Sequence, residues 1–192
     1  LTELAAEIIL GADISDKFKV TVLFDSFYLC PQVVNACKQR KWHYIGVSKS
    51  NRWFTFNAVK HKIGKYGRNI LNRGGIWYSI AGLRKTAGYK LAQRVGTMNK
   101  LGEVKVVFSK RKGDKAVIAL VTDDINMSMK KVVSRYLKRW AIEVMIKEQK
   151  QHLGLGDYRV LRYRAIVRHL CLVDSAYACL THLGLKTYGV QG

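Results

Sequence analysis

A strand, a helix and a second strand follow one another within the first fifty residues, and this order constrains the fold more than any other feature. Residues 19–24 are mostly apolar and rich in Val, which predicts a buried strand that ends directly before Asp25. Pro31 begins a helical pattern that continues to about Lys41, and residues 43–47 form a second strand pattern. Because a helix joins the two strands, they are expected to pair in parallel, which predicts an α/β fold with a mixed sheet.

The chain changes character after residue 50, where glycines and basic side chains become frequent. Three alternating runs in this segment predict antiparallel strands, at 76–83, 90–95 and 104–109. The continuous apolar run 116–121 is typical of a central strand, so we expect it to return to the first sheet. The sequence therefore predicts a core interrupted by a β-rich insertion, with the parts 1–50, 51–115 and 116–192.

Positive charge is concentrated in the middle of the chain. The formal net charge is +21, and residues 38–115 carry 20 basic side chains against two acidic ones. Aromatic side chains are interleaved with these cations, a combination that is typical of surfaces that bind phosphates and bases. We expect a nucleic-acid partner, because so large an excess of one charge repels itself unless a polyanion neutralises it. The alternative is a basic face exposed only to solvent.

Two helices are predicted after the last strand. Ser128 is a candidate cap for a helix that continues to about His152, and a final amphipathic helix is expected over residues 159–182. Asp123 and Asp124 come just before the first of these helices. We interpret both acids as side chains that favour the positive end of the helix dipole.

Four polar side chains share one face of the predicted helix that starts at Ser128. At helical spacing, Tyr136, Arg139, Glu143 and Lys150 fall within a narrow stripe, next to an apolar arc. A carboxylate flanked by a guanidinium, an ammonium and a phenol suits a phosphodiester: Glu143 binds a metal ion and the other three position the backbone. The alternative is an ordinary surface ion pair between Arg139 and Glu143.

The stretch from Tyr136 to Lys150, with its tyrosine, arginine, glutamate and lysine, resembles the signature of the DDE transposases of bacterial insertion-sequence family four. Asp25, after the run Val-Leu-Phe, resembles the second catalytic aspartate of that family. The basic segment 51–115 resembles the family's β insertion, and the last helix resembles its closing helix. Because these four features agree in order and spacing, the resemblance covers nearly the whole chain. It implies a partial ribonuclease H-like sheet flanked by helices.

The resemblance also implies the chemistry. Asp25 and Glu143 would be two of three carboxylates that hold two Mg²⁺ ions, for which Mn²⁺ substitutes, during cleavage of DNA strands and joining of a 3′ hydroxyl. Tyr136, Arg139 and Lys150 would contact the DNA. The implied partner is double-stranded DNA, as transposon ends and target, bound by a homodimer in the bacterial cytoplasm.

The family's first aspartate has no counterpart upstream of Asp25, where the acids are expected on a helix and a loop. We therefore predict that this segment alone binds DNA without cutting it. Two alternatives stay open for the missing carboxylate. Asp13 or Asp16 replaces the first aspartate, or Asp25 is itself the first aspartate and Asp114 is the second. Two other functions also stay open, a non-catalytic DNA-binding domain and a structure-selective nuclease.

The four cysteines lack the density of a disulfide scaffold and the close pairing of a zinc site. We expect reduced thiols. The alternative is a metal site formed by Cys30, Cys37 and His43. No leader peptide or long apolar run is visible, which predicts a cytosolic protein.

Overall fold

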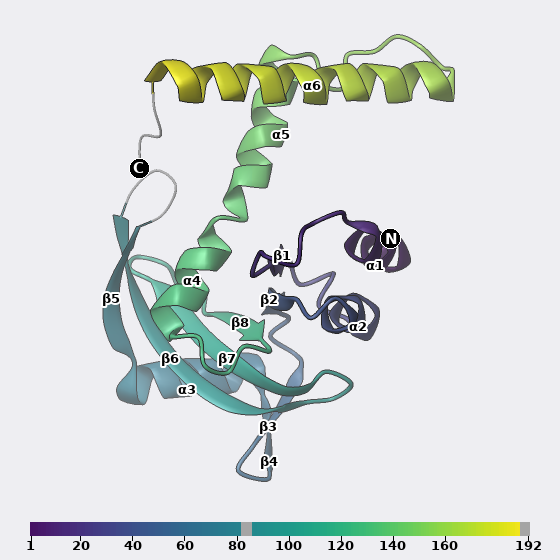
Figure 1. Cartoon of the computed structure of the whole chain (residues 1–192). Coiled ribbons are helices and arrows are strands. Elements are labelled where there is room, and N and C mark those ends of the chain that lie inside the picture. Colours follow the sequence, from purple (N-terminus) through teal and green to yellow (C-terminus); the bar gives the residue numbers. More distant parts are fainter. Residues whose placement is uncertain (82–85, 189–192) are drawn as a thin grey trace. The chain divides into compact units, whose positions relative to one another are not determined.

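The computed structural model describes residues 1–81 and 86–188 and divides into two compact units, Leu1–Arg139 and Trp140–Gly192 (Figure 1). The first unit is mixed α/β, with one mostly antiparallel sheet flanked by helices. The second unit contains helices α5 (Trp140–His152) and α6 (Tyr163–Tyr188).

The described strands form one sheet in the order β1-β2-β8-β7-β6-β3-β4, and β5 pairs with β6 outside this path. β1 and β2 run parallel, with Phe24 opposite Gly46, whereas the other neighbours are antiparallel. The sheet thus combines the predicted parallel pair with strands from the basic segment. The strands are β1 (Thr21–Phe24), β2 (His43–Ser48), β3 (Trp53–Phe56), β4 (Val59–Lys62), β5 (Ile76–Ala81), β6 (Thr86–Met98), β7 (Gly102–Arg111) and β8 (Ile118–Thr122).

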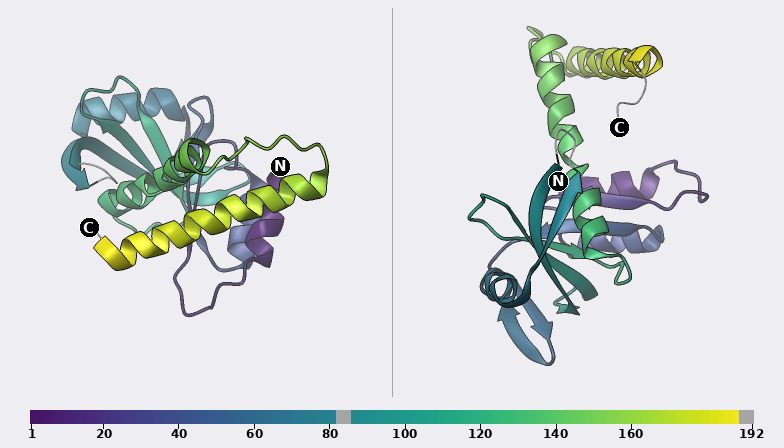
Figure 2. Two further views of the ribbon diagram at one scale, coloured as in Figure 1. Left: turned by 90° about the horizontal axis from the view of Figure 1, so that it is seen from above. Right: turned by 90° about the vertical axis from the view of Figure 1, so that its left-hand side faces the viewer.

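Both faces of the sheet are covered within the first unit. Helices α1 (Thr2–Gly11), α2 (Pro31–Gln39) and α3 (Ile63–Gly74) contribute to one apolar core, in which Phe108 is fully buried. Helix α4 (Met129–Leu137) covers the opposite face, over a second core. Figure 2 (right) shows α3 and α4 on opposite sides of β6 and β7. Strands β7 and β8 contribute apolar side chains to both cores, because successive residues of a strand point to opposite faces of the sheet.

Helices α5 and α6 are joined by a few polar contacts. The Gln149 side chain is 2% exposed and its Nε2 donates to Asp174 Oδ1 at 2.8 Å. Tyr177 Oη donates to Glu148 Oε2 at 3.2 Å. Among the helices in the described part of the chain, none combines the length and apolarity needed to cross a lipid bilayer.

Several expectations from the sequence are confirmed. The strand after Pro31–Gln39 pairs in parallel with β1, and the apolar run 116–121 becomes β8, which lies between β2 and β7. The strand patterns at 90–95 and 104–109 lie within β6 and β7. The predicted strand 76–83 is observed as β5 up to Ala81, and its last two positions lie outside the described residues.

One expectation is incomplete and one is wrong. The segment predicted as β-rich contains strands β3 to β7 and also a full helix, α3, whose Ile63, Gly67 and Leu71 form its buried side at helical spacing. The single helix predicted from Ser128 to His152 is interrupted at residues 138 and 139. There the amide of Arg139 donates to the carbonyl of Tyr136 at 3.0 Å, three residues back instead of four, which tightens the turn and ends α4.

Candidate functional site

Asp25 follows directly on β1, at the carboxyl end of the parallel pair. Its side chain is exposed, and Oδ1 accepts a hydrogen bond from the backbone amide of Phe27 at 2.8 Å. This local turn fixes the carboxylate with respect to the strand. The preceding residue, Phe24, stacks on Tyr44 with ring centroids 5.7 Å apart. Asp25 is therefore an exposed acid on a rigid support, as a metal ligand requires.

The loop after Asp25 is anchored at its far end. Leu29 is fully buried in the core, and its carbonyl accepts a hydrogen bond of 2.5 Å from Arg52 Nη2. Close packing between β1 and β2 also holds the residue before Asp25, because a Cβ on Gly46 would lie 2.3 Å from the Phe24 ring. Only glycine fits at that position of β2. These contacts fix the backbone on both sides of the Asp25 carboxylate.

Tyr136 and Arg139 lie together at the end of α4. The Arg139 guanidinium lies over the Tyr136 ring, 5.7 Å from its centroid, and Tyr136 packs partly buried against the second core. The neighbouring Arg135 donates from Nη1 to Thr21 Oγ1 at 2.9 Å, which connects the last turn of α4 to β1. Two of the residues predicted to contact DNA are thus brought together on the unit that carries Asp25.

The start of α4 is fixed by three polar contacts. Ser128 is the cap predicted from the sequence, since its hydroxyl accepts a hydrogen bond from the Lys131 amide at 3.3 Å. Lys105, on β7, is buried, and its Nζ donates to the Met127 carbonyl at 2.8 Å. Desolvation lowers the pKa of this ammonium. Asp124 Oδ1 accepts from the amide of Met127 at 3.0 Å.

Glu143 and Lys150 belong to the second unit. Glu143 is half-buried in the first turn of α5, and Lys150 is exposed in the last turn of the same helix. The predicted stripe is therefore divided between α4, the turn after it and α5. That Glu143 lies beside Asp25, and Lys150 beside Arg139, stays a prediction.

Asp123 has a role that the sequence did not indicate. Instead of capping α4, its Oδ1 accepts from the Tyr44 amide at 3.0 Å, and its Oδ2 is 3.2 Å from His43 Nδ1. Burial, and after it the charge of Asp123, raise the pKa of the Cys37 thiol to about 12 and also raise the pKa of Tyr44. His43 and Asp123 are 80 residues apart, so no local pattern announces the pair.

The described side chains form no cluster of metal ligands. Across residues 1–81 and 86–188, no group of three or more His, Cys, Asp or Glu side chains is placed to hold a metal ion. The alternative site at Cys30, Cys37 and His43 is therefore not formed. The Asp25 carboxylate has the hard-oxygen chemistry that suits Mg²⁺, but it is one ligand, and the first unit alone does not complete a site.

A family model described as the transposase DDE domain matches residues 3–179. The chain belongs to this family. The matched range includes Asp25 and the whole stretch from Tyr136 to Lys150. DDE transposases are nucleotidyl-transfer enzymes that act on DNA and generally use divalent metal ions. No curated protein gives a match to the chain.

Proposed function

We propose that this member of the DDE transposase family contributes two of the three metal-binding carboxylates of a ribonuclease H-like core. Asp25 would be the second acid and Glu143 the third. The observation that carries the proposal is the position of Asp25, exposed at the carboxyl end of β1 in a parallel pair, within a chain that matches the family over most of its length. When bound, two Mg²⁺ ions, or Mn²⁺, would activate water and then a 3′ hydroxyl for attack on phosphorus.

The other polar residues of the signature would hold the DNA backbone. Arg139 offers a planar guanidinium for a phosphate, and its contact with the Tyr136 ring holds that group in one orientation. Lys150 would add a second cation from α5. In this proposal the three side chains bind the substrate beside the metal ligands, and Arg139 carries the largest share because its hydrogen bonds are charge-assisted and bidentate.

The first carboxylate has no candidate among the described residues before β1. Glu3 and Glu7 are on α1, and Asp13 and Asp16 are in the segment that follows it. None of the four is on a strand. We propose that the chain alone binds double-stranded DNA without cutting it, and that a protein supplying the first aspartate cleaves transposon ends and joins them to target DNA. The parts 1–50, 51–115 and 116–192, a synaptic homodimer and a place near the bacterial nucleoid belong to this proposal.

The test is a nicking assay on supercoiled plasmid with Mg²⁺, together with DNA affinity measured in parallel. We expect binding with no nicking by the chain itself. When the chain is joined to a segment that supplies the first aspartate, nicking should appear. It should then fall by at least about a thousandfold in Glu143→Gln.

The control for that assay is Glu148→Gln, on the same helix, which should keep nicking within about twofold. Robust nicking by the chain alone that disappears in Asp25→Ala would contradict the proposal that a carboxylate is missing. Full nicking in the joined protein after Glu143→Gln would contradict the role of Glu143.

A non-catalytic DNA-binding domain is the second candidate, and the absence of a three-ligand cluster among the described residues favours it. The two candidates differ in their response to Mg²⁺. If Asp25 and Glu143 hold metal ions, Mg²⁺ should strengthen DNA binding by the wild-type chain and leave binding by Glu143→Ala unchanged. If the domain only binds DNA, Mg²⁺ should affect both proteins equally.

A further inference from the structure

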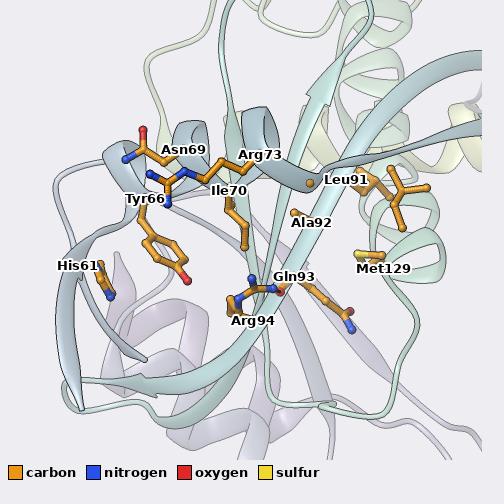
Figure 3. A pocket seen from close by; sticks show the side chains of 12 residues that line it. His61, Tyr66, Asn69, Ile70, Arg73, Leu91, Ala92, Gln93, Arg94 and Met129 are labelled. Atoms are coloured by element: carbon orange, nitrogen blue, oxygen red, sulfur yellow. Dashed lines mark hydrogen bonds between the residues drawn. The ribbon is translucent and has the colours of Figure 1, made fainter. Parts of the chain in front are cut away.

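A pocket of about 520 Å³ lies between α3 and β6 in the first unit (Figure 3). Its polar lining comes from three elements: His61 on β4, Tyr66, Asn69 and Arg73 on α3, and Gln93 and Arg94 on β6. The remaining wall is apolar, and no acidic residue lines the pocket. Its cations belong to the basic segment, and none of Asp25, Tyr136, Arg139, Glu143 and Lys150 lines it.

The pocket exists because one edge of β6 is only partly paired. β5 pairs with β6 as far as Leu91, and β3 meets it at Thr97. Between these points, within the described chain, no strand pairs with residues 92–96 on that side. Helix α3 connects β4 to β5, and the pocket lies between this helix and the unpaired edge. Sheet edges left unpaired in this way present polar groups to a ligand.

Two buried polar atoms of the lining have no hydrogen-bond partner among the described residues. They are Nε of Arg94, a donor, and Oε1 of Gln93, an acceptor. The Arg94 guanidinium is oriented by two contacts: Nη1 donates to the Gln93 carbonyl at 2.8 Å, and Cζ lies 5.3 Å from the centroid of the Phe56 ring. A donor that is fixed, charged and unsatisfied favours an anionic ligand.

A second cation faces the pocket from the helix. In Figure 3 the Arg73 side chain extends over the top of the Tyr66 ring, and the hydroxyl of Tyr66 points towards Arg94. Tyr66 also packs on His61, with ring centroids 4.4 Å apart, which holds the phenol in place. Two guanidinium groups and a phenol from opposite walls thus surround one space.

We propose that this pocket binds a phosphate group, through Arg73 and Arg94, on a ligand whose apolar part rests against the wall of the pocket. One guanidinium group can donate two parallel hydrogen bonds to two oxygens of a phosphate. The low dielectric of an apolar wall strengthens the electrostatic attraction between the guanidinium and the phosphate. The volume lies in the range of pockets that hold small ligands. The phosphate belongs either to the backbone of bound DNA or to a free nucleotide. The inference rests on the proposed DNA binding if the phosphate is that of DNA and goes beyond it if the phosphate is that of a nucleotide, and in both cases it involves neither Asp25 nor Glu143.

Nuclear magnetic resonance of the ¹⁵N-labelled chain tests the proposal through the Nε–Hε signals of Arg94 and Arg73. The chain is titrated without divalent metal with inorganic phosphate, with deoxyadenosine monophosphate and with a short DNA duplex. We expect saturable shifts of both signals. Arg94→Gln should weaken binding by about tenfold. Arg73→Gln, made separately at an exposed position, should have an effect of the same size.

The matched control is Arg68→Gln on the same helix, a charge change outside the pocket lining, which should weaken binding by less than about twofold. Shifts with the nucleotide but not with the duplex assign the site to free nucleotides, and shifts with the duplex assign it to DNA. The proposal is overturned if neither arginine signal shifts with any probe. It is also overturned if Arg68→Gln weakens binding as much as the two pocket variants, because the effect would then be general charge.

Discussion

The two units differ in how much of their own surface they bury. In Leu1–Arg139 two apolar cores cover both faces of a sheet, and Phe108 and Leu120 are almost completely buried. In the described part of the second unit, only Gln149 and Val173 are buried, while Leu161 is fully exposed. Asp25 is therefore positioned by a core within its own unit, whereas Glu143 is on a helix of a unit in which few described side chains are buried.

The largest difference should appear in the reactivity of the four thiols, two in each unit. Cys37 is fully buried, and burial raises its pKa from an ordinary 9.0 to about 12, whereas Cys171 and Cys179 are exposed. Near pH 8 the raised pKa alone reduces the thiolate of Cys37 by about a thousandfold. Timed labelling with a thiol reagent and mass spectrometry should therefore modify the exposed pair first. Rapid labelling of Cys37 in the native chain would show that the core of the first unit is open.

A large-to-small substitution in each unit tests the same contrast by stability. Phe108→Ala should lower the free energy of unfolding by about 3–5 kcal/mol, because it removes a fully buried ring from between α3 and the sheet. Leu172→Ala, at a side chain 70% exposed on α6, should change it by no more than about 0.5 kcal/mol. Urea unfolding followed by circular dichroism measures both. Similar losses in the two variants would contradict the difference between the units.

Two glycines of α3 show how closely the first unit is packed. A Cβ at Gly67 would lie 2.4 Å from the Phe108 ring, whereas a Cβ at Gly74 meets no atom within 4 Å. Gly67→Ala should therefore destabilise the chain by about 1–3 kcal/mol in spite of the better helix propensity of alanine. Gly74→Ala should be neutral or stabilise by up to about 1 kcal/mol. Thermal melts of the two variants decide this, and a stabilising Gly67→Ala would mean that α3 does not press on Phe108.

The smallest effect is expected from the hydrogen bond between α5 and α6. Gln149→Ala removes the donor to Asp174 and should reduce the local stability of α6 by about 1 kcal/mol. Hydrogen exchange of the backbone amides around Asp174 measures this loss. Gln151→Ala, at an exposed position of the same helix, is the control and should leave exchange unchanged. Equal exchange rates in the two variants would show that this hydrogen bond does not stabilise the contact between α5 and α6.

The sequence predicted those parts of the fold that depend on local pattern. An apolar run that ends at Asp25, followed by a helix that begins at Pro31 and by a second apolar run, is enough to indicate the parallel pair. Ser128 is a recognisable helix cap. Helix α3 was missed because Gly64 and Gly67 hide a helical spacing of apolar residues; tertiary packing against Phe108 outweighs the low propensity of glycine.

The candidate site was less predictable than the fold. The break after α4 contains neither glycine nor proline, so the stripe from Tyr136 to Lys150 looked continuous in the sequence. The hydrogen bond between Asp123 and His43 joins residues far apart in the chain, so the sequence does not predict it. Asp123 makes this contact in place of the expected contact with the start of α4. The helical spacing of the stripe indicated a phosphodiester contact and a metal-binding role for Glu143, whereas the role of Asp25 and its pairing with Glu143 came from the family resemblance.

The central claim is that Asp25 and Glu143 bind the same pair of metal ions, and a titration with paramagnetic Mn²⁺ tests it most directly. We expect substoichiometric Mn²⁺ to broaden the backbone amide signals next to Asp25 and next to Glu143 together, at equal metal concentration. In Asp25→Asn both sets of signals should stay sharp. Broadening at one of the two carboxylates alone, or at neither, would contradict a shared metal site.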